Sequence, residues 1–135
     1  MGNNACQNLC SKKNPKGDGT GETVTKVDFK YYNAIGRGGF GKVIKVERNG
    51  KMYAMKEMLK ARVMAKKSIE SVMKELELMC KINSDFIVNV HYAFHDQAYL
   101  YLVMDLMEGG DLRFHHSKIR KFPAECTRFF IACLL

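Results

Sequence analysis

The pattern of apolar and polar residues predicts three strands at the start of the ordered part of the chain. Segments 29–35, 43–46 and 51–58 are rich in β-branched, aromatic and other apolar residues, as is typical of strands. Asn49 and Gly50 separate the last two segments, and both residue types accept the positive φ angles of a two-residue hairpin turn. These segments are therefore expected to form antiparallel strands.

A helical period replaces the strand pattern after residue 67. Apolar residues recur at intervals of three and four between Ser68 and Ile82, which predicts an amphipathic helix. Glu75 lies between Val72 and Met79 on this apolar stripe. Its carboxylate is therefore expected on the buried side of the helix.

Two more strands are expected after this helix, in segments 86–94 and 99–104. Gly109 and Gly110 then interrupt the pattern, and Asp111 is a suitable N-cap for a helix. Five strands with one helix inserted between the third and the fourth indicate an α+β fold.

The last segment predicts a further helix in which Pro123 occupies the first turn. Apolar residues continue from Phe129 to Leu135, and no Gly, Asn or Pro stop signal follows them. We therefore expect a truncated sequence.

Composition and charge exclude several classes of function. With 135 residues, of which 47% are hydrophobic, one compact domain is expected. The net charge is +8, but acidic residues separate the lysines and no basic stripe contains interleaved aromatic residues, so nucleic acid is not an expected partner. The cysteines form no C-x-x-C pair and no histidine lies at ligand spacing, so no metal site is expected. Without a signal-peptide core or a membrane-spanning run, a cytoplasmic protein is expected.

Residues 1–26 have no periodic apolar pattern and are expected to form a flexible arm. The first residues resemble an N-myristoylation signal at Gly2, although Cys6 stands where Ser or Thr is preferred. Cys6 and Cys10 are candidate palmitoylation sites, and three nearby lysines favour anionic lipid. The protein is thus expected at the cytoplasmic face of a membrane. The alternative is a disordered N-terminus with incidental cysteines.

Gly36, Gly38 and Gly41 have the G-x-G-x-x-G spacing that lets backbone N–H groups approach phosphate oxygens. This motif occurs in several protein classes. A Rossmann loop opens a helix, and a Walker loop needs Ser or Thr where Val43 stands. Because a strand follows the glycines, we expect a phosphate-binding loop between antiparallel strands, which is the protein-kinase arrangement.

Alternate side chains on a strand share a face, so Lys56 is expected beside Met52, Ala54 and Met58. A lysine on an apolar face needs a partner, unless it lies at an edge and its ammonium reaches water. Stranding one member of a buried charge pair costs about 3–5 kcal/mol. We therefore predict that Glu75 pairs with Lys56 and fixes its ammonium against the phosphates of ATP.

Four segments resemble the AGC group of serine/threonine protein kinases, most closely its YANK branch. The similarity extends from about Val27 to Leu135. It implies a kinase small lobe with its hinge over residues 27–108, built from a five-stranded antiparallel sheet and one helix, and the start of a truncated large lobe over residues 109–135. The matching segments are Ile35-Gly36-x-Gly38-x-Phe40-Gly41-Lys42-Val43, Met52-Tyr53-Ala54-Met55-Lys56, Lys74-Glu75-Leu76 and Gly109-Gly110-Asp111-Leu112-Arg113-Phe114-His115.

The resemblance also implies the roles of particular residues. Phosphoryl groups would pass from ATP, with Mg²⁺, to serine or threonine hydroxyls of a protein substrate, and Lys56 and Glu75 would form the activating ion pair. Val43, Ala54 and Leu112 would enclose the adenine. Met104 would be the gatekeeper, backbone groups of Asp105 and Met107 would bind the base, and Asp111 would reach the ribose. The remaining nucleotide-binding residues would be Ile35, Gly36, Gly38, Gly39, Phe40 and Gly41.

Three kinase motifs are absent from the 135 residues: H-R-D-x-x-x-x-N, D-F-G and A-P-E. The catalytic base, the Mg²⁺ ligands and the activation segment would therefore lie beyond Leu135 or not exist. This chain alone is expected to be inactive. The alternative is a non-catalytic, truncated kinase-like module that binds nucleotide or acts as a membrane-tethered interaction partner.

Overall fold

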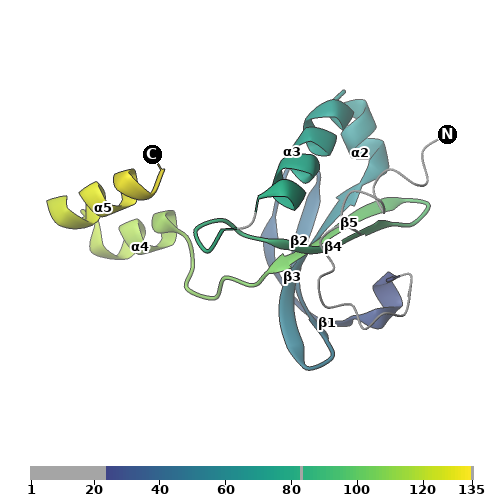
Figure 1. Ribbon diagram of the computed structural model, residues 1–135, viewed down its shortest axis with the longest axis horizontal. Coiled ribbons are helices and arrows are strands. Elements are labelled where there is room, and N and C mark those ends of the chain that lie inside the picture. Colours follow the sequence, from purple (N-terminus) through teal and green to yellow (C-terminus); the bar gives the residue numbers. More distant parts are fainter. Residues whose placement is uncertain (1–23, 83, 135) are drawn as a thin grey trace.

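The computed structural model describes residues 24–82 and 84–134, and its strands form one five-stranded sheet in the order β1-β2-β3-β5-β4. Every neighbouring pair of strands is antiparallel. Figure 1 shows α2 and α3 on one side of this sheet, so the α+β class is confirmed. The elements are η1 (Lys26–Asp28), β1 (Lys30–Arg37), β2 (Gly41–Arg48), β3 (Lys51–Leu59), α2 (Lys60–Ala65), α3 (Ile69–Lys81), β4 (Val90–His95), β5 (Tyr99–Asp105), α4 (Leu112–Ile119) and α5 (Ala124–Leu134).

Local sequence signals correctly predicted one hairpin turn and one helix start. Asn49 and Gly50 have φ angles of 51° and 75°, as a hairpin turn between β2 and β3 requires. At the start of α4, the side chain of Asp111 accepts a hydrogen bond of 2.7 Å from the backbone N–H of Phe114. Both the predicted hairpin and the predicted N-cap are confirmed.

The two faces of the sheet bury different clusters. Met58 and Leu102 lie on the face that packs against α3, whereas Met55 and Val103 lie on the opposite face. Phe29, just before β1, covers that opposite face, and its ring stacks on Phe94 with centroids 5.9 Å apart. The sheet is therefore covered by α3 on one side and by the segment leading into β1 on the other.

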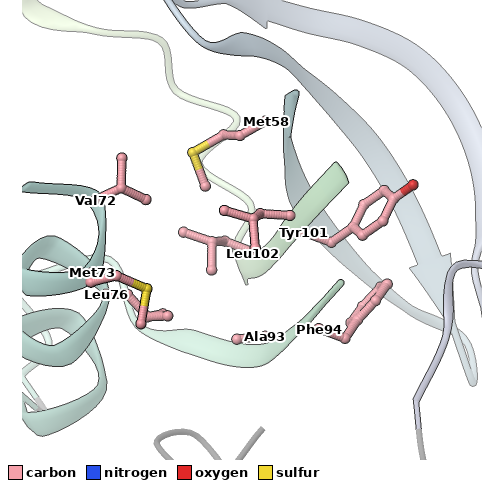
Figure 2. Close-up of a pocket in the computed structure, with 9 residues that line it drawn as sticks. Met58, Val72, Met73, Leu76, Ala93, Phe94, Tyr101 and Leu102 are labelled. Atoms are coloured by element: carbon pink, nitrogen blue, oxygen red, sulfur yellow. The ribbon is translucent and has the colours of Figure 1, made fainter. Parts of the chain in front are cut away.

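Apolar packing fixes α3 against the sheet. Figure 2 shows Met73 and Leu76 of the helix directed toward Ala93 and Leu102 of the strands. The cavity left between them is about 10 Å³, which is at the lower limit for one water molecule, and its lining is apolar. The helix that carries Glu75 is thus held by close packing.

The predicted strand at residues 86–94 was wrong in its first half, because β4 begins only at Val90. The backbone N–H of Phe86 donates to the Ser84 hydroxyl at 3.2 Å, and that of Ile87 donates to the Ser84 carbonyl at 3.3 Å. These local hydrogen bonds form a turn. The apolar pattern of Phe86 and Ile87 resembled a strand although both side chains are exposed.

One helix was not expected, so two helices rather than one separate β3 from β4. α2 has only six residues, too few to show a helical period, and only Val63 is buried among them. Its last turn leads directly into the corner before α3.

The two predicted C-terminal helices are present as α4 and α5. Figure 1 shows them beyond the connector that follows β5, away from the sheet. Their apolar side chains, such as Phe129 and Leu134, are largely exposed. Within residues 24–82 and 84–134, no helix combines the length and the apolar composition needed to cross a bilayer.

The turn between β4 and β5 supports a prediction about pH. Asp96 accepts hydrogen bonds from the Tyr101 hydroxyl and from the backbone N–H groups of Tyr99 and Ala98, and these lower its pKa to about 2. A depressed carboxyl pKa stabilises the fold above the unfolded value of about 4, and this contribution is lost as the pH falls toward 2. We expect Asp96→Asn to lower stability by about 1 kcal/mol at pH 7. Urea unfolding at pH 7 and pH 2 should show this difference shrinking at the lower pH; an equal difference at both values would contradict the assignment.

Candidate nucleotide-binding site

The glycine motif forms the tip of the hairpin between β1 and β2. The N–H of Gly38 donates to the carbonyl of Gly41 at 2.9 Å, and the N–H of Gly41 donates back to the carbonyl of Gly38 at 3.4 Å. Gly36 on β1 lies opposite Val43 on β2. A strand follows the glycines, as predicted, so the loop has neither the Rossmann nor the Walker geometry.

The strand register places residues that were predicted to enclose the adenine or contact the phosphates opposite one another, in two rows across the sheet. Val43 lies opposite Lys56 in one row, and Ala54 lies opposite Met104 in the next. Residues directly opposite each other in neighbouring strands share a face. The face against which α3 packs therefore carries Val43, Ala54, Lys56 and Met104.

The predicted ion pair is present: Lys56 Nζ lies 3.2 Å from Glu75 Oε1. The prediction that this pair is buried was wrong, because the Lys56 side chain is 28% exposed and that of Glu75 is 50% exposed. Val72 and Leu76 occupy the centre of the buried stripe of α3, which leaves Glu75 at its edge. Solvent-exposed ion pairs contribute only about 0–1 kcal/mol to stability. The contact therefore orients the Lys56 ammonium more than it stabilises the fold.

The residues predicted to contact the base lie at the end of β5 and in the connector that follows it. The Asp105 carboxylate accepts hydrogen bonds from His91 Nε2 at 2.6 Å and from the backbone N–H of Asn89 at 3.0 Å. Burial raises the pKa of Asp105, but these hydrogen bonds outweigh it and the pKa is lowered overall. The backbone N–H of Asp105 donates to the Asn89 carbonyl at 3.1 Å, and the role of Asp105 toward the base remains a prediction.

The other connector residues are less enclosed. Met107 is exposed, and Leu112 at the start of α4 is 48% exposed. The Asp111 oxygen Oδ1 caps α4, and because an ionised carboxylate has about four acceptor sites, capacity remains for a ribose hydroxyl. Their roles toward adenine and ribose remain predictions.

A contact without any sequence signal links the hairpin to the connector. Lys45 Nζ on β2 lies 2.6 Å from Glu108 Oε1, 63 positions away in the chain. The hydrogen bond and the charge of Lys45 lower the pKa of Glu108. The pair joins the base of the glycine hairpin to the segment that carries Met107.

Within the part of the chain that the structure describes, no group of three or more His, Cys, Asp or Glu side chains could hold a metal ion. The predicted lipidation residues Gly2, Cys6 and Cys10 lie outside the described residues and remain predictions.

Comparisons with known proteins agree with this geometry. The protein kinase domain model matches residues 29–135. The chain is 41% identical over 115 residues to a probable serine/threonine-protein kinase of Dictyostelium discoideum, covering 84% of this chain and 25% of that protein. It is 36% identical over 111 residues to a RAC family serine/threonine-protein kinase homolog of the same organism (81% and 25% covered). It is also 38% identical over 112 residues to human serine/threonine-protein kinase 32C (82% and 23% covered). The chain thus spans about a quarter of the length of these curated relatives.

Proposed function

Because the chain belongs to the protein kinase domain family, we propose that it supplies the ATP-binding small lobe and hinge of a serine/threonine protein kinase. In this proposal residues 27–108 form the small lobe with its hinge and residues 109–135 begin the large lobe. The placement in the AGC group and its YANK branch is part of the proposal and rests on the four matching sequence segments. The acceptor would be a serine or threonine hydroxyl of a protein substrate.

The Lys56–Glu75 contact carries this proposal. A kinase needs an ammonium group held toward the phosphates of ATP, and a carboxylate 3.2 Å away restricts the Lys56 side chain to one direction. The glycine hairpin lies next to it in the same sheet, and its tip is proposed to approach the phosphate oxygens, although the N–H groups of Gly38 and Gly41 donate within the hairpin in this structure. Phosphoryl transfer depends mainly on positioning and electrostatic stabilisation, and these residues supply part of both.

The rest of the reaction requires groups that these residues do not provide. The substrate hydroxyl needs a base, and Mg²⁺ needs carboxylate and amide ligands, which in this family come from the H-R-D and D-F-G segments. We propose that these groups lie outside residues 1–135. A transcript that continues in frame into both motifs would support the enzyme.

Residue-resolved ATP binding tests the proposal directly. In NMR titrations of the 135-residue chain, ATP is expected to shift the amide signals of Gly38, Gly39 and Gly41 more strongly than adenosine does, because the loop contacts phosphates. Equal shifts with adenosine, or shifts confined to α4 and α5, would contradict the phosphate role of the hairpin.

A second candidate is a non-catalytic kinase-like module, in which the glycine hairpin and the Lys56–Glu75 pair serve binding alone. It would bind nucleotide through the same site. The two candidates differ in one result: the natural full-length protein either transfers the γ-phosphoryl group of labelled ATP to a peptide library or does not.

A further inference from the structure

The tip of the glycine hairpin contacts a lysine from outside the sheet. Lys66 Nζ donates a hydrogen bond of 3.2 Å to the carbonyl of Gly39. The same ammonium lies 5.2 Å from the ring centroid of Phe40, within the range of a cation–π interaction. Phe40 is half-buried and packs against the apolar cluster that includes Val72 and Leu76 of α3. Two adjacent residues of the loop tip are therefore held by one side chain.

The backbone of Lys66 is itself fixed at the corner between α2 and α3. Its N–H donates to the Arg62 carbonyl at 3.2 Å, and its carbonyl accepts a hydrogen bond of 3.0 Å from the Ser68 hydroxyl. Ser68 is the N-cap residue of α3, the helix that carries Glu75. A short, fixed path thus connects the loop tip to the helix of the ion pair.

The Lys66 ammonium also lies next to the space that a side chain at position 39 would occupy. A Cβ added at Gly39 would lie 3.1 Å from Lys66 Nζ, closer than most side-chain contacts. A side chain at this position would therefore require the flexible end of Lys66 to shift by a few tenths of an ångström. Glycine-rich loops lose more conformational entropy on ordering than other segments, so a contact made before the nucleotide binds reduces this cost.

We propose that Lys66 is a positioning residue that holds the tip of the glycine hairpin at the corner between α2 and α3, the helix that carries Glu75. This inference rests on the proposed function, because the hairpin matters only if phosphates bind beneath it. The Lys66 contact pre-orders the loop, so that ATP binds to an arrangement that already exists.

Hydrogen–deuterium exchange in the nucleotide-free 135-residue chain tests the contact without using activity. In Lys66→Met, we expect the loop amides at residues 38–41 to exchange about threefold to fivefold faster, as for the loss of one exposed, charge-assisted hydrogen bond. Lys66→Arg keeps both the donor and the cation over Phe40 and should restore the slow exchange. The matched control is Lys67→Asn, which removes the same charge one position away, where Asn accepts the φ angle of 51°.

The possible outcomes distinguish a failure of the Lys66 contact from a failure of the proposed function. Unchanged loop exchange in Lys66→Met, or equally faster exchange in Lys67→Asn, would overturn the role of Lys66. Weaker ATP binding with unchanged exchange would also overturn it, because Lys66 would then be a direct phosphate ligand. Faster exchange in Lys66→Met, with no ATP binding by the wild-type chain, would support the contact while the proposed function fails.

Discussion

Lys56→Met is expected to lower phosphoryl transfer by the full-length protein about 10²- to 10³-fold, the usual effect of removing one preorganised electrostatic contact to a reacting group. Methionine has nearly the same length and stays apolar, so it can remain beside Ala54 and Met58 on β3. The fold should therefore survive while the cation 3.2 Å from Glu75 is lost. The measurement is kcat/KM with a peptide substrate, together with the melting temperature of the variant.

The matched control for this variant is Lys74→Met. Lys74 is an exposed lysine on α3 next to Glu75, so its replacement changes the net charge equally. We expect its kcat/KM to stay within about twofold of the wild-type value, since surface substitutions have small effects. Retained activity in Lys56→Met, or an equal loss in Lys74→Met, would show that Lys56 does not have the assigned role.

Gly41→Ala is expected to destabilise the domain by about 3 kcal/mol, at the upper end of the usual cost of overpacking. A Cβ at this position would lie 1.8 Å from the carbonyl oxygen of Glu57 and 2.9 Å from its carbonyl carbon. Both atoms belong to the backbone of β3, so the clash cannot be relieved by turning a side chain. The strands β2 and β3 would have to separate where Gly41 lies opposite Met58.

Gly38→Ala provides the comparison within the same loop. No atom lies within 4 Å of a Cβ added there, so its thermal stability should change little. In thermal unfolding of the two variants, Gly41→Ala should lower Tm by on the order of 10 °C relative to Gly38→Ala. Equal melting temperatures would mean that β2 does not approach β3 as closely as described.

The sequence predicted those features that depend on neighbours along the chain. Asn49 and Gly50 specify a hairpin because their own backbone preferences determine the turn. The period of two placed Lys56 on the face of Ala54 and Met58, and the period of 3.6 placed Val72 and Leu76 on the buried side of α3. Local patterns failed where local hydrogen bonds opposed them, as at Ser84 before β4, and where an element was too short to show a period, as in α2.

The contacts of the candidate site across the sheet required the tertiary structure. Spacing suggested that Glu75 could reach Lys56, but only the packing of α3 determined that the pair forms at the edge of the buried stripe and remains partly exposed. The Lys45–Glu108 pair, the contact of Lys66 with Gly39 and the approach of Gly41 to Glu57 join residues far apart in the chain. Local sequence patterns cannot predict contacts between residues that lie so far apart in the chain.

The amino-acid sequence alone predicted the five strands, the helices α3, α4 and α5, the position of the hairpin turn, and which residue types are available to bind phosphate; it missed α2 and placed the start of β4 too early. The tertiary structure decided which charged side chains meet and how much water reaches them. The physical reason is that backbone preferences and apolar periodicity act over a few residues, whereas ion pairs between elements depend on strand register and helix packing, which the whole fold fixes at once.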